Sequence, residues 1–222
     1  MESNNPVPQT GGHIRTHAGS STASIEPIGL RERKKRETFR ALQSAAWRLV
    51  AERGLENVTV DEIAAAANVS KRTFFNYFDS KEAAIVDPDP GRVECLAASL
   101  AARPADEPPL QALRSASMAS LTCHARDLQR LTTLVCANPG LLGPQVQAFN
   151  PLRKVIVEWA AERTGTDPDT DIYPELLAGV TSLMLWLTVS RWRPETGDEA
   201  FIQLADEIFV LLANGLAAPQ KG

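Results

Sequence analysis

The sequence predicts an all-α protein of 222 residues, with a helix-turn-helix near its N-terminus and a larger helical part after it. Apolar residues recur at three- and four-residue spacings through most of the chain, as they do on the buried face of a helix. Capping residues, prolines and glycines separate these periodic stretches. No stretch indicates a strand convincingly, and no internal repeat is visible.

The first helix is expected at residues 31–53. Within this segment Leu42, Ala46 and Leu49 follow the spacing i, i+4, i+7 and therefore share one face. Gly54 comes directly after the segment and supplies a C-terminal stop. The pattern indicates a helix with one buried side.

Two short helices are expected next, joined by a turn. Thr59, with Glu62 three residues later, forms a capping box that starts the first of them. Asn68 tolerates the left-handed conformation that ends such a helix. Ser70 then caps a second helix, expected at 71–78. Two short helices that meet in this way form a helix-turn-helix.

Beyond Ser80 the chain continues as helices that Pro and Gly interrupt. The expected ranges are 90–102, 109–125, 127–137, 150–164, 171–192 and 198–215. The last two are apolar on more than one side, and such a helix must be covered on more than one side. We expect this pair to pack on its own domain and on a partner subunit, with a fully internal pair in a monomer as the alternative.

Charge is distributed unevenly along the chain. The net charge is −4, yet residues 31–81 hold 11 Lys and Arg against 7 Asp and Glu, a balance of +4. Residues 82–222 hold 11 against 18, a balance of −7. A basic block on an acidic body indicates a polyanionic partner for the N-terminal part alone.

Other features exclude several classes of protein. Cys95, Cys123 and Cys136 are odd in number and lack metal or redox spacing, which favours buried thiols in a reduced, cytoplasmic protein. Residues 1–30 have the composition of a disordered tail and no apolar core of a signal peptide. The longest uncharged run, 176–190, is shorter than a membrane span and favours a buried helix. We expect no metal and no cofactor.

The second short helix carries the candidate nucleic-acid contacts. Phe74 and Phe78 lie four residues apart and share one helical face, which we expect to be buried. Lys71, Arg72 and Thr73 stand at the N-terminal end, free to face outward. A DNA major groove admits one helix, and side chains near its N-terminus reach base edges. The pattern therefore predicts a helix that reads DNA.

Residues 31–84 resemble the DNA-binding domain of the TetR family of bacterial regulators. The resemblance rests on these residues: Thr-Val-Asp-Glu-Ile-Ala at 59–64, Val69-Ser70, Thr73, Phe75, Tyr77-Phe78 and Ser80-Lys81-Glu82. It implies a homodimer with three DNA-binding helices and a larger helical regulatory domain. It also implies that the last two helices of each subunit form a four-helix dimer bundle.

The resemblance also implies roles for single residues. By this resemblance, the residues that would contact bases are Lys71, Arg72, Thr73 and Phe75. Those that would contact phosphates are Thr59, Ser70, Tyr77 and Lys81. Phe75 stands where the family often has Tyr, so van der Waals contact to a base or sugar remains but a hydroxyl contact to phosphate is lost.

The basic run at 31–37, "RERKKRE", is a second candidate for DNA. Arg33 and Lys34 are expected to lie along the phosphate backbone or to reach a minor groove. A solvated helix start is the alternative. Basic side chains at a helix N-terminus oppose the macrodipole, which favours an external anion.

The helical half is expected to hold a ligand between its helices. Its candidate pocket residues are Met118, Leu121, Phe149, Trp159, Met184 and Trp186, although each of these residue types is more often plain core than pocket lining. We therefore expect a tail at 1–30, a helix-turn-helix domain at 31–84 and a regulatory and dimerisation domain at 85–222. The expected function is a repressor that binds a pseudo-palindromic DNA operator as a dimer and leaves it when a small apolar ligand binds.

Two alternatives stay open. One is a regulator that activates, or acts without a ligand. The other is a helical enzyme, which no paired acid and base, metal or phosphate motif supports.

Overall fold

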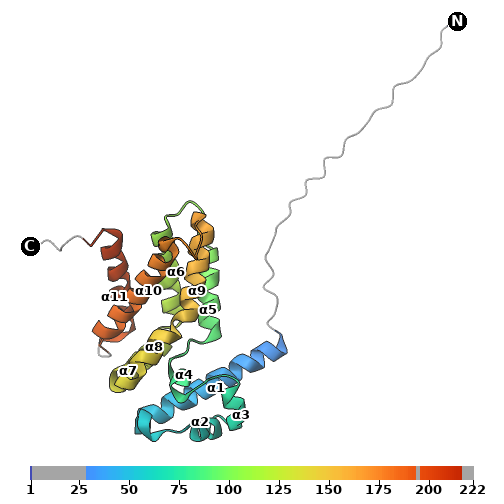
Figure 1. The fold of residues 1–222 in the computed structure, drawn as a ribbon, viewed down its shortest axis with the longest axis vertical. Helices are drawn as coiled ribbons and strands as arrows, with labels where there is room; N and C mark the ends of the chain where they lie inside the picture. Colours follow the sequence, from blue (N-terminus) through green and yellow to red (C-terminus); the bar gives the residue numbers. More distant parts are fainter. Residues whose placement is uncertain (2–28, 194–195, 217–222) are drawn as a thin grey trace, which may run out of the picture.

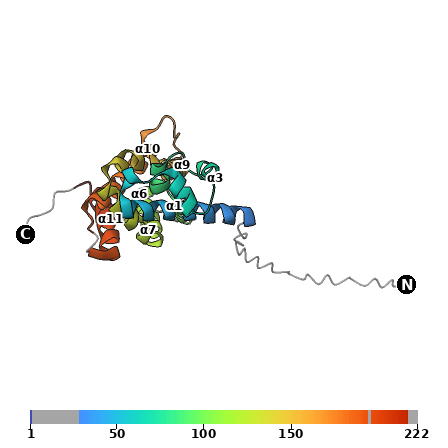
Figure 2. The same cartoon turned by 90° about the horizontal axis from the view of Figure 1, so that it is seen from below.

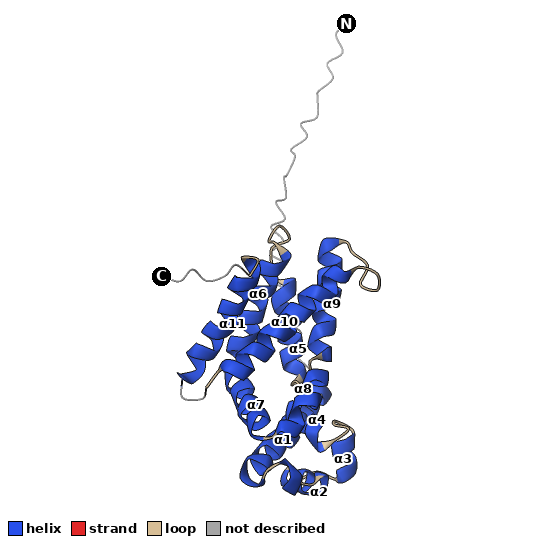
Figure 3. Cartoon of the chain, turned by 60° about the vertical axis from the view of Figure 1, so that its left-hand side comes forward, coloured by secondary structure: helices blue, strands red, loops and turns tan. Residues whose placement is uncertain are grey.

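The computed structural model describes Met1 and residues 29–193 and 196–216. The regular structure in these ranges is entirely helical, which confirms the predicted all-α class (Figure 3). Residues 2–28, on which the expected disordered tail falls, lie outside the described part.

The helices are α1 (Leu30–Arg53), α2 (Val60–Ala66), α3 (Lys71–Phe75), α4 (Lys81–Val86), α5 (Pro90–Ala101), α6 (Pro109–Cys123), α7 (Ala125–Ala137), α8 (Leu142–Ala148), α9 (Asn150–Thr164), α10 (Ile172–Arg191) and α11 (Gly197–Ala213). Two short 3-10 turns lie at Leu55–Asn57 and Pro139–Leu141. In Figure 1, α2 and α3 lie at one end and α5, α6, α9 and α10 at the other.

Two helices differ from the expectation. α3 ends at Phe75 because the amides of Asn76 and Tyr77 bond to carbonyls only three residues back, which closes a tight turn. α8 was not expected, since Gly143 and Pro144 suggest a loop. Both residues fall in its first turn. A backbone N–H has no helical partner there, so proline, which lacks an N–H, is tolerated.

α1 is the support of the helix-turn-helix. The ring of Phe39 on α1 lies 4.6 Å from the ring of Phe78, which lies 5.8 Å from the ring of Phe74 on α3. Phe74 and Phe78 are 0% and 2% exposed, so the prediction that both are core residues is confirmed. In the view from below, α1 runs across the rest of the chain and α3 lies on the opposite side from α11 (Figure 2).

The buried residues form two clusters. One lies between α1, α2, α3 and α4 and also includes Leu131 and Leu134 of α7 and Ala148 of α8. The other lies between α5, α6, α9, α10 and α11. The first cluster therefore extends well beyond residue 84, and α7 and α8 join the helix-turn-helix to the larger helical part.

The cysteines correct one expectation. Cys95 is partly buried, but Cys123 and Cys136 are exposed free thiols rather than buried ones. Among the described residues, no group of three His, Cys, Asp or Glu side chains could hold a metal ion.

α10 is less buried than the sequence suggested. By length and composition it could cross a membrane, a test that core helices of soluble proteins also pass, and 39% of its apolar window is buried. One face packs on α9 and α11 through residues such as Leu177 and Met184. The opposite face leaves Leu176, Leu183 and Trp186 exposed.

The aromatic contact beneath α3 yields a stability prediction. Phe74→Ala should lower the free energy of unfolding by about 3–5 kcal/mol, because the buried ring would leave a cavity. Phe75→Ala, at a neighbouring side chain that is 49% exposed, should lower it by less than about 1 kcal/mol. Urea denaturation of the DNA-free protein measures both. Equal losses would contradict the placement of the two rings.

Candidate nucleic-acid interface and interior cavity

Local hydrogen bonds build the turn between α2 and α3. The Thr59 hydroxyl accepts from the Glu62 amide at 3.3 Å, and the Glu62 carboxylate accepts from the Thr59 amide at 2.9 Å, which confirms the capping box. Asn68 has φ 54°, the left-handed conformation expected of it. The Ser70 hydroxyl accepts from the Thr73 amide at 3.0 Å and starts α3. These local hydrogen bonds therefore determine where α3 begins.

Arg53, the last residue of α1, bonds to Glu62 of the same capping box. Its guanidinium donates to the Glu62 carboxylate at 2.7 Å. This bond, together with those from Thr59, lowers the pKa of Glu62 to about 2. Glu62 therefore stays ionised at neutral pH and keeps accepting at the start of α2.

Most of the proposed base-contacting side chains face outward together. Lys71, Arg72 and Phe75 are exposed on α3. Lys71 pairs with Asp61 at 2.8 Å, but both side chains are more than half exposed, so the pair contributes little and DNA can displace it. Thr73 is only partly exposed, and its hydroxyl lies 2.8 Å from that of Ser70. The outer face of α3 therefore offers two cations and one ring.

The phosphate candidates differ in how free they are. Thr59 and Ser70 are exposed, and Tyr77 is partly buried. The Lys81 ammonium donates to the carbonyl oxygens of Leu55 at 2.8 Å and Val58 at 3.1 Å. Two of its three protons are thus engaged in holding the chain between α1 and α2, and one is left for a phosphate.

The start of α1 forms a groove with α3 of about 1000 Å³. Its α1 side includes Arg31, Lys34 and Lys35, and its other side includes Thr73 and Tyr77. Of these three cations only Lys34 was expected from the sequence, although positions 31, 34 and 35 share a helical face. This groove places three cations and one carboxylate, that of Glu32, next to Thr73 of α3.

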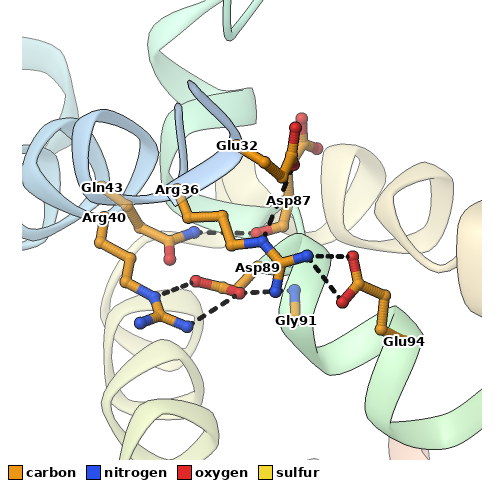
Figure 4. Close-up of polar contacts among 8 residues, drawn as sticks. All are labelled: Glu32, Arg36, Arg40, Gln43, Asp87, Asp89, Gly91 and Glu94. Carbon is orange, nitrogen blue, oxygen red and sulfur yellow. Dashed lines mark hydrogen bonds and ion pairs between the residues drawn. The ribbon is translucent and has the colours of Figure 1, made fainter. Parts of the chain in front are cut away.

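The other basic side chains of α1 point elsewhere. Arg33 does not line the groove, and its guanidinium lies 3.8 Å from the Glu37 carboxylate on the exposed surface. The Arg36 guanidinium instead makes two bonds of 2.6 and 2.8 Å to Glu94 of α5 (Figure 4). Arg40 donates to Asp89 at 2.6 Å, next to the start of α5. These two arginines connect the helix-turn-helix to the larger helical part.

Asp89 contributes to that connection in two ways. Burial opposes its ionisation, but the Arg40 guanidinium and the Gly91 amide hold the pKa of its carboxyl below the usual range. One of its oxygens caps α5 by accepting from the Gly91 amide at 2.7 Å. Asp89 therefore ties the start of α5 to α1.

Two further side chains of α1 hold the end of α4 and the segment that follows it. The Gln43 amide donates to the Asp87 carbonyl oxygen at 2.8 Å (Figure 4). The Trp47 indole donates to the Ile85 carbonyl oxygen at 2.8 Å in a buried site. Any movement of this segment must therefore move α1 or break these bonds.

The predicted pocket residues do not all meet. Leu121, Phe149 and Met184 line a hollow of about 30 Å³ between α5, α6, α9 and α10. Trp186 lines an outer groove of about 400 Å³ between α8 and α10, which Phe149 also lines. Met118 and Trp159 line none of the hollows described here, and the Arg163 guanidinium covers the Trp159 ring at 5.2 Å. The sequence analysis missed Arg92 and Leu185, which line the inner hollow.

Comparison with known proteins identifies the family. The model of the tetR family of bacterial regulatory proteins matches residues 42–85, and the model of the MftR C-terminal domain matches residues 107–217. HTH-type transcriptional regulator TcmR of Streptomyces glaucescens is 34% identical over 197 residues, which cover 83% of this chain and 87% of that protein. The chain belongs to the TetR family. It is a DNA-binding transcriptional regulator, as the sequence predicted.

Solved structures of TetR-like regulators share the fold. The fatty acid degradation regulator FadR from Bacillus halodurans has a TM-score of 0.53 and 18% identity, covering 81% of this chain and 96% of its own. FadR from Thermus thermophilus, solved with lauroyl-CoA, has a TM-score of 0.50 and 24% identity, covering 82% of this chain and 97% of its own. At these identities the likeness shows the fold alone.

The segment between α4 and α5 yields a pH prediction. Burial, with a smaller effect from nearby Asp79, raises the pKa of Asp87 to about 6. Because the folded state holds this proton more tightly than the unfolded chain, stability falls as pH rises from about 4 through 6. Asp87→Asn should therefore raise the free energy of unfolding by about 1 kcal/mol at pH 7.5, a value discounted for partial exposure, and leave it unchanged at pH 4.

Urea denaturation at the two pH values measures this difference. Asp106→Asn, at an exposed loop carboxylate, is the matched control and should change stability at neither pH. A gain for Asp87→Asn that is the same at both pH values would contradict the raised pKa.

Proposed function

We propose that this TetR-family regulator is a dimeric repressor that binds a pseudo-palindromic operator and leaves it when a small, largely apolar ligand binds. The observation that carries the proposal is the position of α1. It holds the exposed reading helix α3 through buried aromatic rings and holds the start of α5 through Arg36 and Arg40. A change in the larger helical part can therefore reach the DNA-binding face through one helix.

Base contacts are assigned to α3. Lys71 and Arg72 would donate to the O6 and N7 atoms of guanine in the major groove. Thr73 and Phe75 would make apolar contact with thymine methyl groups or sugars. The proposal is supported by the exposure of Lys71, Arg72 and Phe75 on one short helix whose inner face is closed by Phe74.

Phosphate contacts are assigned to both sides of α3. The hydroxyl groups of Thr59, Ser70 and Tyr77 would donate to phosphate oxygens of the DNA. Lys81 would donate its remaining proton to a phosphate as well. From the groove, Lys34 would act together with Arg31 and Lys35, whereas Arg33 is a weaker candidate because Glu37 accompanies it. Each phosphate contact releases counterions, so operator affinity should fall steeply with salt.

Dimerisation is assigned to the exposed face of α10. Ile172, Leu176, Leu183 and Trp186 follow three- and four-residue spacings or their sums and are 81%, 58%, 44% and 57% exposed. A contiguous apolar stripe on a soluble domain indicates a protein partner. A second copy that packs this stripe against α10 and α11 would cover both, and would place two α3 helices on one face of the DNA.

The ligand is assigned to the region between α5, α6, α9 and α10. The inner hollow there is only about 30 Å³, but Phe149 and Leu185 separate it from the outer groove of about 400 Å³. In Thermus thermophilus FadR a molecule with an apolar chain is bound in the same fold. A ligand here would act only through a difference in its affinity for the operator-bound and released forms.

We propose regulation rather than catalysis, in the cytoplasm where the operator lies. The relatives are transcriptional regulators. Turnover of a bound ligand by the purified protein would contradict this assignment.

The base contacts are tested by selecting random duplex DNA with purified protein. The wild-type protein should enrich an inverted repeat. Arg72→Ala should lose about 1–3 kcal/mol of operator affinity and relax the preference at one position of each half-site. Lys154→Ala, which removes an exposed cation from α9, is the matched control and should enrich the same repeat. An unchanged repeat for Arg72→Ala would contradict the contact, and no enrichment by wild type would contradict the proposed function.

The dimer is tested by sedimentation in the absence of DNA. Leu183→Glu should shift the protein toward monomer and weaken self-association at least about 100-fold, because it buries an unpaired charge in the stripe. Ala98→Glu, at an exposed position on α5, should leave the mass of the particle unchanged. A dimer that survives Leu183→Glu would place the interface elsewhere.

A further inference from the structure

Arg92 is a cation inside the apolar part of the molecule. It lies in the first turn of α5 and lines two adjoining hollows of about 30 Å³ each. The other residues around it include Leu96, Leu128, Leu152 and Leu185. Its side chain is partly exposed rather than fully buried, and the residue lines both hollows.

Within the described side chains, the Arg92 guanidinium has no ion-pair partner. Among residues 29–193, 196–197 and 199–216, no carboxylate oxygen lies within 4.0 Å of it. Burial lowers the pKa of Arg92 to about 10, opposed only by a distant attraction to the exposed Asp127. Arg92 thus remains protonated at neutral pH, and an unpaired buried charge is costly.

A second polar group at the same hollow also lacks a partner. The hydroxyl of Ser117 on α6 is buried, the residue being 3% exposed, and it makes no hydrogen bond within the described part of the chain. Ser120 of α6 and Thr181 of α10 line the same hollow. Buried hydroxyl groups are normally satisfied, so an unbonded one next to an unpaired cation indicates an absent acceptor.

We propose that the effector is an apolar acid whose anionic group, a carboxylate or sulfonate, pairs with Arg92 and accepts a hydrogen bond from Ser117. This inference rests on the proposed ligand response of the regulator and names the chemistry of its ligand. The anionic group would offset the desolvation penalty of the Arg92 guanidinium, because a neutral ligand would leave Arg92 unpaired.

The neighbouring side chains show where the apolar body of the ligand goes. Phe149 and Leu185 line both inner hollows and also the outer groove of about 400 Å³. Displacing these two side chains would join the hollows to the groove and give a volume in the range of small-molecule sites. An acid would then have its anion near α5 and its body between α8 and α10.

The test uses two dyes that share one apolar skeleton and fluoresce when it is buried. Anilinonaphthalene sulfonate carries an anion, and phenylnaphthylamine is the same skeleton without it. We expect the full-length protein to bind both. Arg92→Met should weaken the anionic dye at least about tenfold and change the neutral dye by less than about twofold, whereas Arg92→Lys should retain part of the preference.

Two controls separate recognition from folding. Arg126→Met, at an exposed arginine of α7, should leave both dissociation constants unchanged. Arg92→Met should raise the melting temperature of the ligand-free protein by roughly 5 °C, since an unpaired buried charge is removed. A lower melting temperature with equal loss of both dyes would show a structural arginine and overturn the inference.

The same experiment distinguishes this inference from the proposed function. If Arg92→Met affects neither dye selectively, the anion site is wrong even where a dye releases the selected operator duplex. If the anionic dye binds through Arg92 but leaves operator affinity unchanged, the anion site stands and the proposed ligand response fails. Binding of neither dye by the wild-type protein would overturn both.

Discussion

The contact between Phe39, Phe78 and Phe74 is the constraint on which the position of α3 depends. α3 has only five residues, and a helix of that length has little stability of its own. The burial of Phe74 and Phe78 against α1 fixes its axis, and the Ser70 cap fixes its start. The backbone that carries the outward side chains is therefore held in one position, which would lower the cost of ordering them on the DNA that we propose they contact.

α1 also holds the start of α5, because its different faces contact different parts of the chain. One side holds the aromatic rings, and another carries Arg36, Arg40, Gln43 and Trp47 toward the segment that leads into α5. The ion pairs are partly exposed and each contributes at most about 1 kcal/mol, so they direct the orientation of α5 more than they stabilise it. Arg92 lies in the first turn of α5, close to this connection. A ligand that pairs with Arg92 would therefore act near the point where the helix-turn-helix meets the larger helical part.

The sequence predicted what local patterns determine. The capping box, the left-handed Asn68 and the inner position of Phe74 all follow from residues a few places apart. Of the run "RERKKRE" it chose Arg33 and Lys34, but it did not predict that Arg31 and Lys35 line the groove with Lys34, or that Arg36 turns toward Glu94 of α5. It also did not single out Arg92, since the hollows around this residue are lined by five later helices, α6 to α10.

The most direct test of the account is the distance between the two α3 helices of a dimer. Spin labels at Asn76→Cys, in a chain whose three native cysteines are replaced by serine, report this distance by double electron–electron resonance. With the selected operator bound, we predict one narrow distribution close to the separation of successive major grooves, about 34–36 Å. Absence of dipolar coupling in the complex, or a distribution that the operator does not change, would contradict the account of a dimer that reads two half-sites.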